Sequence, residues 1–283
     1  MKKGLVLEGG AMRGLFTCGV LDVFLENGIT FDGAAGISAG ATFGINFKSG
    51  QAGRALRYNL KYGRDPRYCS FQSLRKTGDL YGADFCYHEI PDVLDPFDRE
   101  AFRQNPMEFY IGASDVETGR PVFHRCSDCG DVDVEWMRAS ASMPVVSQIV
   151  SVSGRKMLDG GITCPIPYYF MEAMGYDRNV IVLTQPLGYI KKKSAIIPLM
   201  KLVLRRYPEI IRAMERRHKV YNAQTEAIRR REEAGKVLVI RPEAPLEINR
   251  TEGDPEELTR VYLLGREEAE KRLEEIRAFL CEG

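Results

Sequence analysis

Short apolar runs and helical repeats alternate along the first part of this chain. The run Leu5-Val6-Leu7 predicts a buried strand, and apolar positions at helical spacing over 15–27 predict a helix that ends at Asn27-Gly28. A second short run at 31–35 predicts another strand, and a helix is expected over 41–46. This order of strand, helix, strand and helix is typical of a parallel sheet with helices on both faces.

The rest of the chain continues the α/β pattern. Alternating positions predict strands at 107–114 and 121–125, and residues 51–105 predict short helices and long loops. The other expected elements are a helix at 133–141, a hairpin between Ser153-Gly154 and Asp159-Gly160-Gly161, strands at 179–183 and 236–241, and amphipathic helices within 254–280. We therefore predict one compact α/β domain over 1–283, a three-layer sandwich with a mostly parallel central sheet.

Composition narrows the function classes. Lys and Arg number 40 and Asp and Glu number 39, so the net charge of +1 provides no general positive field for nucleic acid. The first apolar run stops at Glu8-Gly9-Gly10, too early for a signal peptide, and no apolar run approaches the length of a membrane span. Seven cysteines without an export signal are typical of free thiols in a reducing cytoplasm. We expect a cytoplasmic protein that binds no nucleic acid.

The motif Gly36-Ile37-Ser38-Ala39-Gly40 places a serine between the second predicted strand and the helix after it. In a Gly-x-Ser-x-Gly nucleophile elbow, the serine sits on a strained turn, and Gly36 and Gly40 leave room for the tight backbone. Small-residue turns also recur for packing reasons alone. The context of a strand before and a helix after favours Ser38 as a nucleophile.

A glycine-rich turn, Gly9-Gly10-Ala11-Met12-Arg13-Gly14, follows the first predicted strand. It lacks the middle glycine of a dinucleotide-binding loop, and the second strand ends in Ser38 rather than in an acidic residue, so a nucleotide site is disfavoured. Successive N–H groups at such a turn can instead form a preorganised oxyanion site. The alternative is a glycine turn that only lets a helix pack tightly.

A serine nucleophile needs a base, and histidine is a weak candidate here. A Ser38, Asp159 and His218 triad has the chain order of α/β-hydrolases, but only one strand precedes Ser38. His218 lies in a basic run that disfavours an imidazolium, and we expect it to be a solvated helix residue. His88 and His124 are expected to be structural.

Asp159 is the other candidate base. It opens the turn Asp159-Gly160-Gly161, where two glycines let a carboxylate approach another backbone closely. An exposed aspartate is a weak base, but burial in an apolar pocket would raise its pKa. Such turns are usually structural, so this motif indicates a catalytic aspartate only in combination with the glycine-rich turn and the Ser38 elbow.

These three motifs, in this order, resemble the patatin-like phospholipase family. That family's glycine motif reads Gly-Gly-Gly-x-Arg/Lys-Gly, and Gly9, Gly10, Arg13 and Gly14 match it, with Ala11 in place of the third glycine. The segment Ala139-Ser140-Ala141-Ser142-Met143-Pro144 is also similar to the family's Ala-Ser-x-Ala/Ser-x-Pro segment. The resemblance covers 4–172, whereas 173–283 carries no assignable motif, and the chain looks like a bacterial, stand-alone member.

The resemblance implies a doubly covered α/β sheet and a lipid acyl hydrolase that uses a Ser-Asp dyad without histidine, metal or cofactor. It implies Ser38 as nucleophile, Asp159 as base, and an oxyanion hole on the N–H groups around Gly10 to Met12. That hole survives if Ala11 has a negative φ. Arg13 either steadies the loop or meets a phosphate head group.

Two other clusters carry weaker signals. His124, Cys126 and Cys129 resemble half of a zinc site, but structural zinc needs four ligands, so an exposed loop with free thiols is expected. The basic amphipathic segment 191–219 either lies on an anionic membrane surface, at the inner membrane face, or covers the core as an ordinary helix.

We therefore predict a serine acyl hydrolase acting on a lipid or other acyl ester. Two alternatives stay open. One is a non-catalytic lipid- or partner-binding module whose Ala11 has spoiled the oxyanion hole. The other is a triad hydrolase that uses His218.

Overall fold

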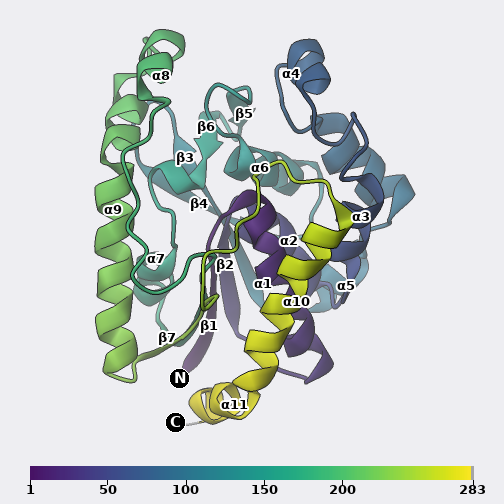
Figure 1. Cartoon of the computed structure of the whole chain (residues 1–283), viewed down its shortest axis with the longest axis vertical. Helices are drawn as coiled ribbons and strands as arrows, with labels where there is room; N and C mark the ends of the chain where they lie inside the picture. The colour runs from purple at the N-terminus through teal and green to yellow at the C-terminus, as the bar shows by residue number, and fades with distance from the viewer. Residues whose placement is uncertain (282–283) are drawn as a thin grey trace.

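A mixed sheet of eight strands forms the middle layer of the computed structural model, which describes residues 1–281 (Figure 1). The strands are β1 (Lys2–Leu7), β2 (Gly33–Ile37), β3 (Glu108–Asp115), β4 (Pro121–Cys126), β5 (Val150–Val152), β6 (Arg155–Asp159), β7 (Tyr176–Val182) and β8 (Val237–Ile240). Their order is β5-β6-β3-β2-β1-β7-β8, and β4 also pairs with β3. Strands β3, β2, β1, β7 and β8 run parallel, whereas β4, β5 and β6 form antiparallel pairs. The predicted mostly parallel sheet is confirmed.

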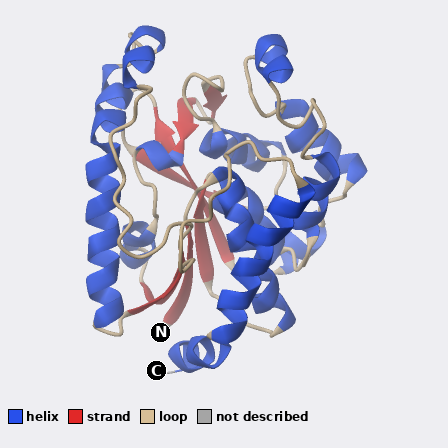
Figure 2. Ribbon diagram, in the orientation of Figure 1, coloured by secondary structure: helices blue, strands red, loops and turns tan. Residues whose placement is uncertain are grey.

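Helices cover both faces of this sheet (Figure 2). One face carries α1 (Gly14–Glu26), α2 (Ala39–Lys48) and α6 (Asp131–Ala141), with α10 (Pro255–Lys271) packed on α1. The other face carries α7 (Tyr168–Ala173) and the long helix α9 (Pro208–Glu233). The shorter elements are η1 (Ala11–Arg13), α3 (Arg54–Tyr62), α4 (Phe71–Thr77), the π-helix η2 (Phe85–Leu94), α5 (Arg99–Gln104), η3 (Gly160–Ile162), α8 (Ile197–Val203) and α11 (Leu273–Cys281). The three predicted layers are therefore present.

Strand β1 shows how the sequence builds these layers. Leu5 and Leu7 belong to the core cluster that includes α1 and α2, while Val6 packs in a second cluster with Ile181 and Tyr221. Successive side chains of a strand point to opposite faces, so a strand that is covered on both faces needs apolar residues at every position. This is why a continuous apolar run predicts a central strand here.

The C-terminal part of the chain completes the same sheet, because β7 pairs in parallel with β1, and β8 pairs with β7. The basic segment 191–219 is not one helix but an extended arm, α8 and the first part of α9. In α9, Ile210, Ile211 and Met214 are buried against the core. Among the described helices, none is both long and apolar enough to cross a membrane.

Candidate active site

Ser38 lies at the turn between β2 and α2, where its backbone adopts φ 53° and ψ −121°. These angles lie outside the regions used by strands and helices, and such strain costs about 1–3 kcal/mol. The first turn of α2 holds the residue, because the N–H groups of Ala41 and Thr42 donate to the Ser38 carbonyl at 2.9 and 3.0 Å. The chain therefore forms a strained strand-to-helix elbow at Ser38.

The glycines around Ser38 serve this elbow through close backbone contact. A Cβ at Gly40 would lie 2.5 Å from the carbonyl oxygen of Leu7 in β1, which cannot move aside as a side chain would. Gly36 is buried within β2, directly before the turn. A larger residue at Gly40 would push α2 away from β1, so the motif spacing has a steric reason.

The register of β3 brings Asp159 to the elbow. Strand β2 ends with Ile37 opposite Gly112, whereas β6 runs in the opposite direction and ends with Asp159 opposite Ala113. Because β4 occupies the other edge of β3, β2 and β6 lie end to end along one edge. Ser38 and Asp159, at the two strand ends, therefore come together beside the middle of β3.

Asp159 is 3% exposed, and its surroundings have opposing effects on the pKa of its carboxyl group. Burial raises the pKa of Asp159 above its usual value. The charge of Arg217, the Ser38 hydroxyl and the Gly161 N–H, which donates to Asp159 Oδ1 at 2.7 Å, each lower that pKa. The net result is a buried carboxyl group that interacts with the Ser38 hydroxyl and is more basic than an exposed aspartate.

A buried serine at the C-terminal end of α6 holds the elbow in position. The Ser140 hydroxyl accepts a hydrogen bond from the Ser38 N–H at 2.8 Å and donates to the Gly112 carbonyl at 2.6 Å. Nearby, the Ser142 carbonyl accepts the Asp159 N–H at 2.8 Å. This end of α6 thus contacts the backbone of both site residues, a role that the sequence motif did not reveal.

Replacing Ser140 with alanine is expected to lower the free energy of unfolding by about 2–3 kcal/mol, because the buried Ser38 N–H and Gly112 carbonyl lose their partner. Ester hydrolysis should fall at least about tenfold, since a misplaced nucleophile reacts slowly. Urea unfolding and initial rates measure the two effects. Ser142→Ala is the matched control, because the Ser142 hydroxyl donates to the helix carbonyl of Arg138. Equal losses in both variants would contradict this role of Ser140.

The glycine-rich turn packs against the elbow, since a Cβ at Gly9 would lie 3.0 Å from the Ser38 Cβ. The turn continues through η1, which includes Arg13, into Gly14 at the start of α1. Within residues 1–281, the N–H groups of Gly10, Ala11 and Met12 have no hydrogen-bond acceptor. Orphan N–H groups at a helix N-terminus favour a negative charge, so this turn can hold an oxyanion beside Ser38.

The backbone conformation of Ala11 differs from the one on which the predicted oxyanion hole depends. The negative φ on which the predicted oxyanion hole depends is not found, because Ala11 adopts φ 49°. This left-handed region is open to glycine, whereas alanine enters it at a cost of about 1 kcal/mol. The alanine therefore adds strain, but the turn still leaves the N–H groups of Gly10, Ala11 and Met12 without an acceptor within residues 1–281.

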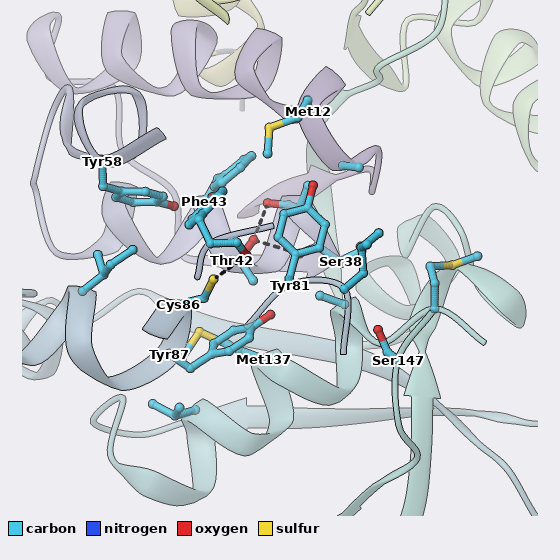
Figure 3. Close-up of a pocket in the computed structure, with 18 of the residues that line it drawn as sticks. Met12, Ser38, Thr42, Phe43, Tyr58, Tyr81, Cys86, Tyr87, Met137 and Ser147 are labelled. Carbon is cyan, nitrogen blue, oxygen red and sulfur yellow. Dashed lines mark hydrogen bonds between the residues drawn. The ribbon is translucent and has the colours of Figure 1, made fainter. Parts of the chain in front are cut away.

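Ser38 is one of the residues that line an apolar cavity of about 340 Å³ (Figure 3). Its walls come from α2, α6 and the segment between α3 and η2, and its side chains are mostly apolar or aromatic. Those labelled in the close-up include Met12, Phe43, Tyr58, Tyr81, Tyr87 and Met137. A cavity of this kind is typical of a site for an apolar ligand, and residues 51–105 supply much of its wall.

Neither His124 nor His218 is hydrogen-bonded to Ser38 or Asp159 in residues 1–281. His124 Nε2 lies 2.6 Å from Asp133 Oδ1, and its ring stacks on Trp136. His218, expected to be a solvated helix residue, is half-buried on α9, and its Nδ1 is buried without a hydrogen-bond partner. Within the described part of the chain, no hydrogen bond joins His218 to Ser38 or Asp159. The geometry therefore gives the triad alternative no support.

The expected exposed loop of thiols is also wrong, because Cys126 and Cys129 are both buried. Cys126 ends β4, where its side chain faces the core. No group of three or more His, Cys, Asp or Glu side chains among residues 1–281 is placed to hold a metal ion.

Arg217 of α9 is a site residue that the sequence pattern did not reveal. Its Nε donates to the Gly161 carbonyl at 2.6 Å, and its charge acts on Asp159. The charges of Lys191 and Arg250 act in the same region. The basic run at 216–219 was the available signal, but helical periodicity alone does not tell which of its members turns toward the sheet.

A family model described as patatin-like phospholipase matches residues 5–170, more than half of the chain. The chain belongs to the patatin-like phospholipase family. The matched part of this patatin-like protein contains the glycine-rich turn, the Ser38 elbow and Asp159. A second model, for a domain of unknown function named DUF6363, matches residues 207–281, which include Arg217 and Arg250.

Curated relatives of this patatin-like protein match part of it. The uncharacterized protein YjjU of Escherichia coli K12 is 31% identical over 190 residues, which are 64% of this chain and 52% of YjjU. An uncharacterized NTE family protein of Mycobacterium tuberculosis H37Rv is 25% identical over 178 residues, 63% of this chain and 48% of that protein. Lysophospholipase nte1 of Aspergillus oryzae is 25% identical over 62% of this chain and 11% of its own length. The chain thus spans about half the length of the two bacterial relatives.

Among solved structures, VipD from Legionella pneumophila is similar over 97% of this chain and 67% of VipD, with a TM-score of 0.47 and 13% identity.

Proposed function

We propose that this patatin-like protein is a serine acyl hydrolase of phospholipase A or lysophospholipase type, with Ser38 and Asp159 as a catalytic dyad. The observation that carries the proposal is the buried Asp159 carboxyl group, which interacts with Ser38, a lining residue of the apolar cavity. A buried aspartate with a raised pKa is a better general base than an exposed one. Family membership and the fungal relative's name, lysophospholipase, support the same reaction class.

The proposed reaction has two steps. Ser38 Oγ attacks the ester carbonyl carbon while Asp159 accepts the hydroxyl proton, and the carbonyl oxygen takes up negative charge near the N–H groups of Gly10, Ala11 and Met12. The C–O bond then breaks, and Asp159 returns the proton to the leaving alcohol. In the second step Asp159 takes a proton from water while the water oxygen attacks the acyl carbonyl carbon. The bond from this carbon to Ser38 Oγ then breaks, Asp159 returns the proton to Oγ, and the fatty acid leaves.

The cavity leads to an expected chain-length profile. If each methylene group needs roughly the volume of one liquid water molecule, about 30 Å³, a cavity of about 340 Å³ holds a chain of about ten carbons. We expect kcat/KM for nitrophenyl esters to rise at least about tenfold from acetyl to decanoyl, because each buried methylene contributes about 0.8 kcal/mol, and then to level off. Initial rates across the series measure this. A maximum at acetyl would show that the cavity does not receive the acyl chain.

The second candidate function is a non-catalytic lipid-binding module. It requires that Ala11 disrupts the oxyanion hole. Although Ala11 adopts a φ of 49°, the N–H groups of Gly10, Ala11 and Met12 have no acceptor within residues 1–281, which favours the catalytic proposal. Lipid binding without any ester hydrolysis by the wild-type protein would favour the module instead.

We also propose peripheral contact with an anionic membrane surface through α8, the outer part of the segment 191–219. Leu199, Leu202 and Val203 of α8 are 46%, 69% and 56% exposed, and exposed cations lie around them. These cations are Lys192, Lys193, Lys201, Arg205 and Arg206. Exposed apolar side chains flanked by cations suit an anionic lipid interface.

The double variant Leu202→Ser, Val203→Ser is expected to lower co-sedimentation with phosphatidylglycerol vesicles at least about fivefold at low salt, because two apolar contacts are lost. Leu263→Ser is the matched control, since Leu263 is 54% exposed on α10. Sedimentation that is absent in the wild type, or equal in all three proteins, would rule out contact through α8.

A further inference from the structure

Four cationic side chains gather around the proposed dyad, each from a different segment. Arg13 belongs to the glycine-rich turn, Lys191 to the arm between β7 and α8, Arg217 to α9, and Arg250 to the loop between β8 and α10 (Figure 1). The charges of Arg217 and Arg250 act on Asp159, and those of Arg13, Arg217 and Arg250 act on Lys191. The C-terminal part of the chain thus adds positive charge to a site whose dyad comes from the N-terminal part.

Carboxylates of the protein do not balance this cluster. Glu8 and Asp159 are the acidic groups that act on it. Glu8 is already engaged, because its Oε2 accepts the N–H and the hydroxyl of Thr184 at 2.6 and 3.2 Å. None of the four cations forms an ion pair with a carboxylate anywhere in residues 1–281. Arg13, Lys191 and Arg217 are half-buried, and Arg250 is exposed. Half-buried cations that lack a carboxylate partner carry a desolvation cost, so the cluster favours an anionic ligand.

Two of the cations are well placed to donate hydrogen bonds to such a ligand. Arg13 Nε is buried and has no hydrogen-bond partner within the described chain. The Lys191 ammonium group lies 4.3 Å from the centre of the Tyr221 ring. Burial, together with the charges of Arg217 and its neighbours, lowers the pKa of Lys191 to about 8. An anion beside these groups would receive charge-assisted hydrogen bonds from both.

The fold holds the backbone in place at two of these cations, Lys191 and Arg250. The Asn222 side chain of α9 accepts the Lys191 N–H at 2.8 Å and donates to the Lys191 carbonyl at 3.1 Å. The Tyr81 hydroxyl, on the cavity wall, donates to the Arg250 carbonyl at 2.8 Å. These hydrogen bonds hold the backbone at both positions, so less conformational freedom is lost there when a ligand binds.

We propose that Arg13, Lys191, Arg217 and Arg250 form a subsite for a phosphate group of the substrate, so that anionic monoacyl phospholipids such as acylglycerol phosphates are preferred. This inference rests on the proposed hydrolase function. Arg250 and Ser38 both line the cavity, so a head group attached to a cavity-bound acyl ester lies next to the cluster. The inference also gives the segment 207–281, matched by a domain of unknown function, a role in substrate selection.

The same cluster disfavours a choline head group. Quaternary ammonium groups bind over aromatic rings, but the rings of Tyr189 and Tyr221 already face Lys191, at 5.6 and 4.3 Å. A choline group at these rings would meet the Lys191 ammonium group. An anionic head group avoids this repulsion, so it is expected to be preferred.

The test compares 1-decanoylglycerol 3-phosphate with uncharged 1-decanoylglycerol. In the wild type, kcat/KM is expected to be at least about tenfold higher for the phosphate ester, and Lys191→Met is expected to reduce this ratio about tenfold, the effect of one charge-assisted hydrogen bond. Methionine keeps the apolar stem and removes one charge from a repulsive cluster, so the melting temperature should not fall. Lys236→Met, at an exposed position just before β8 and outside both proposed binding surfaces, is the matched control and should keep the wild-type ratio.

The other possible results contradict either the phosphate subsite or the hydrolase function on which it rests. A wild-type ratio near one, or an unchanged ratio in Lys191→Met, overturns it, and equal rates on decanoyl glycerophosphocholine overturn the preference for anionic head groups. Inhibition by inorganic phosphate with an unchanged ratio would assign the cluster to a free ion. If the wild type hydrolyses neither ester, the hydrolase function fails. A melting-temperature shift by decanoylglycerol 3-phosphate then still supports the subsite if Lys191→Met removes it, and overturns it otherwise.

Discussion

Ser38→Ala is expected to remove ester hydrolysis, with kcat lower by about 10⁴-fold or more, because the reaction loses its nucleophile. The fold should survive, since alanine keeps the Cβ that packs against the turn at Gly9. Initial rates on a decanoyl ester and thermal unfolding measure the two effects.

Ser38→Gly is the matched variant for the backbone at this position. Glycine adopts φ 53° without the steric cost that serine and alanine carry, although it also gains freedom in the unfolded chain. We therefore expect Ser38→Gly to be as inactive as Ser38→Ala and of similar stability. An alanine variant that keeps more than about a tenth of the wild-type rate would contradict the role of Ser38 as nucleophile.

Asp159→Asn is expected to lower kcat about 10³-fold or more, because the amide keeps the shape of the side chain but cannot accept the Ser38 proton. Stability should not fall. The pKa of Asp159 is raised by burial, so the fold favours its neutral form over its charged form. Asparagine, which is neutral at every pH, removes the cost of the buried charge. Rates and melting temperatures measured at pH 7 report both effects.

The same shift fixes the sign of the pH dependence. Catalysis needs the carboxylate, so the acid limb of kcat/KM is expected above the ordinary aspartate pKa of about 3.9 and should be lost in Asp159→Asn. The group contributes to stability below its unfolded pKa, and this contribution is lost as the pH rises through the raised folded pKa. An Asp159→Asn variant with full activity would contradict the dyad, and a loss of activity in His218→Ala with activity kept in Asp159→Asn would point to a triad.

The local pattern of apolar and polar residues was sufficient to predict the central strands and the order of the first four elements. Residues such as Leu5, Val6 and Leu7 are apolar because both faces of their strand are covered, and this reads directly from the sequence. The cavity wall formed by the segment from α3 to η2 was not predictable in the same way. Its aromatic residues, such as Tyr58 and Tyr87, serve a tertiary surface and follow no single period.

In the site too, the local turns could be predicted from the sequence, whereas the contacts between distant segments could not. The motifs around Ser38 and Asp159 indicate tight turns, but their meeting depends on the register of β2 and β6 along β3, which no local pattern states. Arg217 and Lys191 come from segments far along the chain, where their charges could equally face solvent. The φ of 49° at Ala11 is also set by the surrounding fold, because alanine alone prefers a negative φ.

Covalent labelling with a fluorophosphonate tests most directly whether Asp159 activates Ser38. Peptide mass spectrometry of the wild-type protein is expected to find one label, on Ser38, because an activated serine attacks phosphorus as it attacks an ester carbonyl. Labelling should be slowed at least about 10²-fold in Asp159→Asn, which loses its general base, and absent in Ser38→Ala. A folded wild-type protein that remains unlabelled at Ser38, or one that reacts no faster than Asp159→Asn, would contradict the dyad.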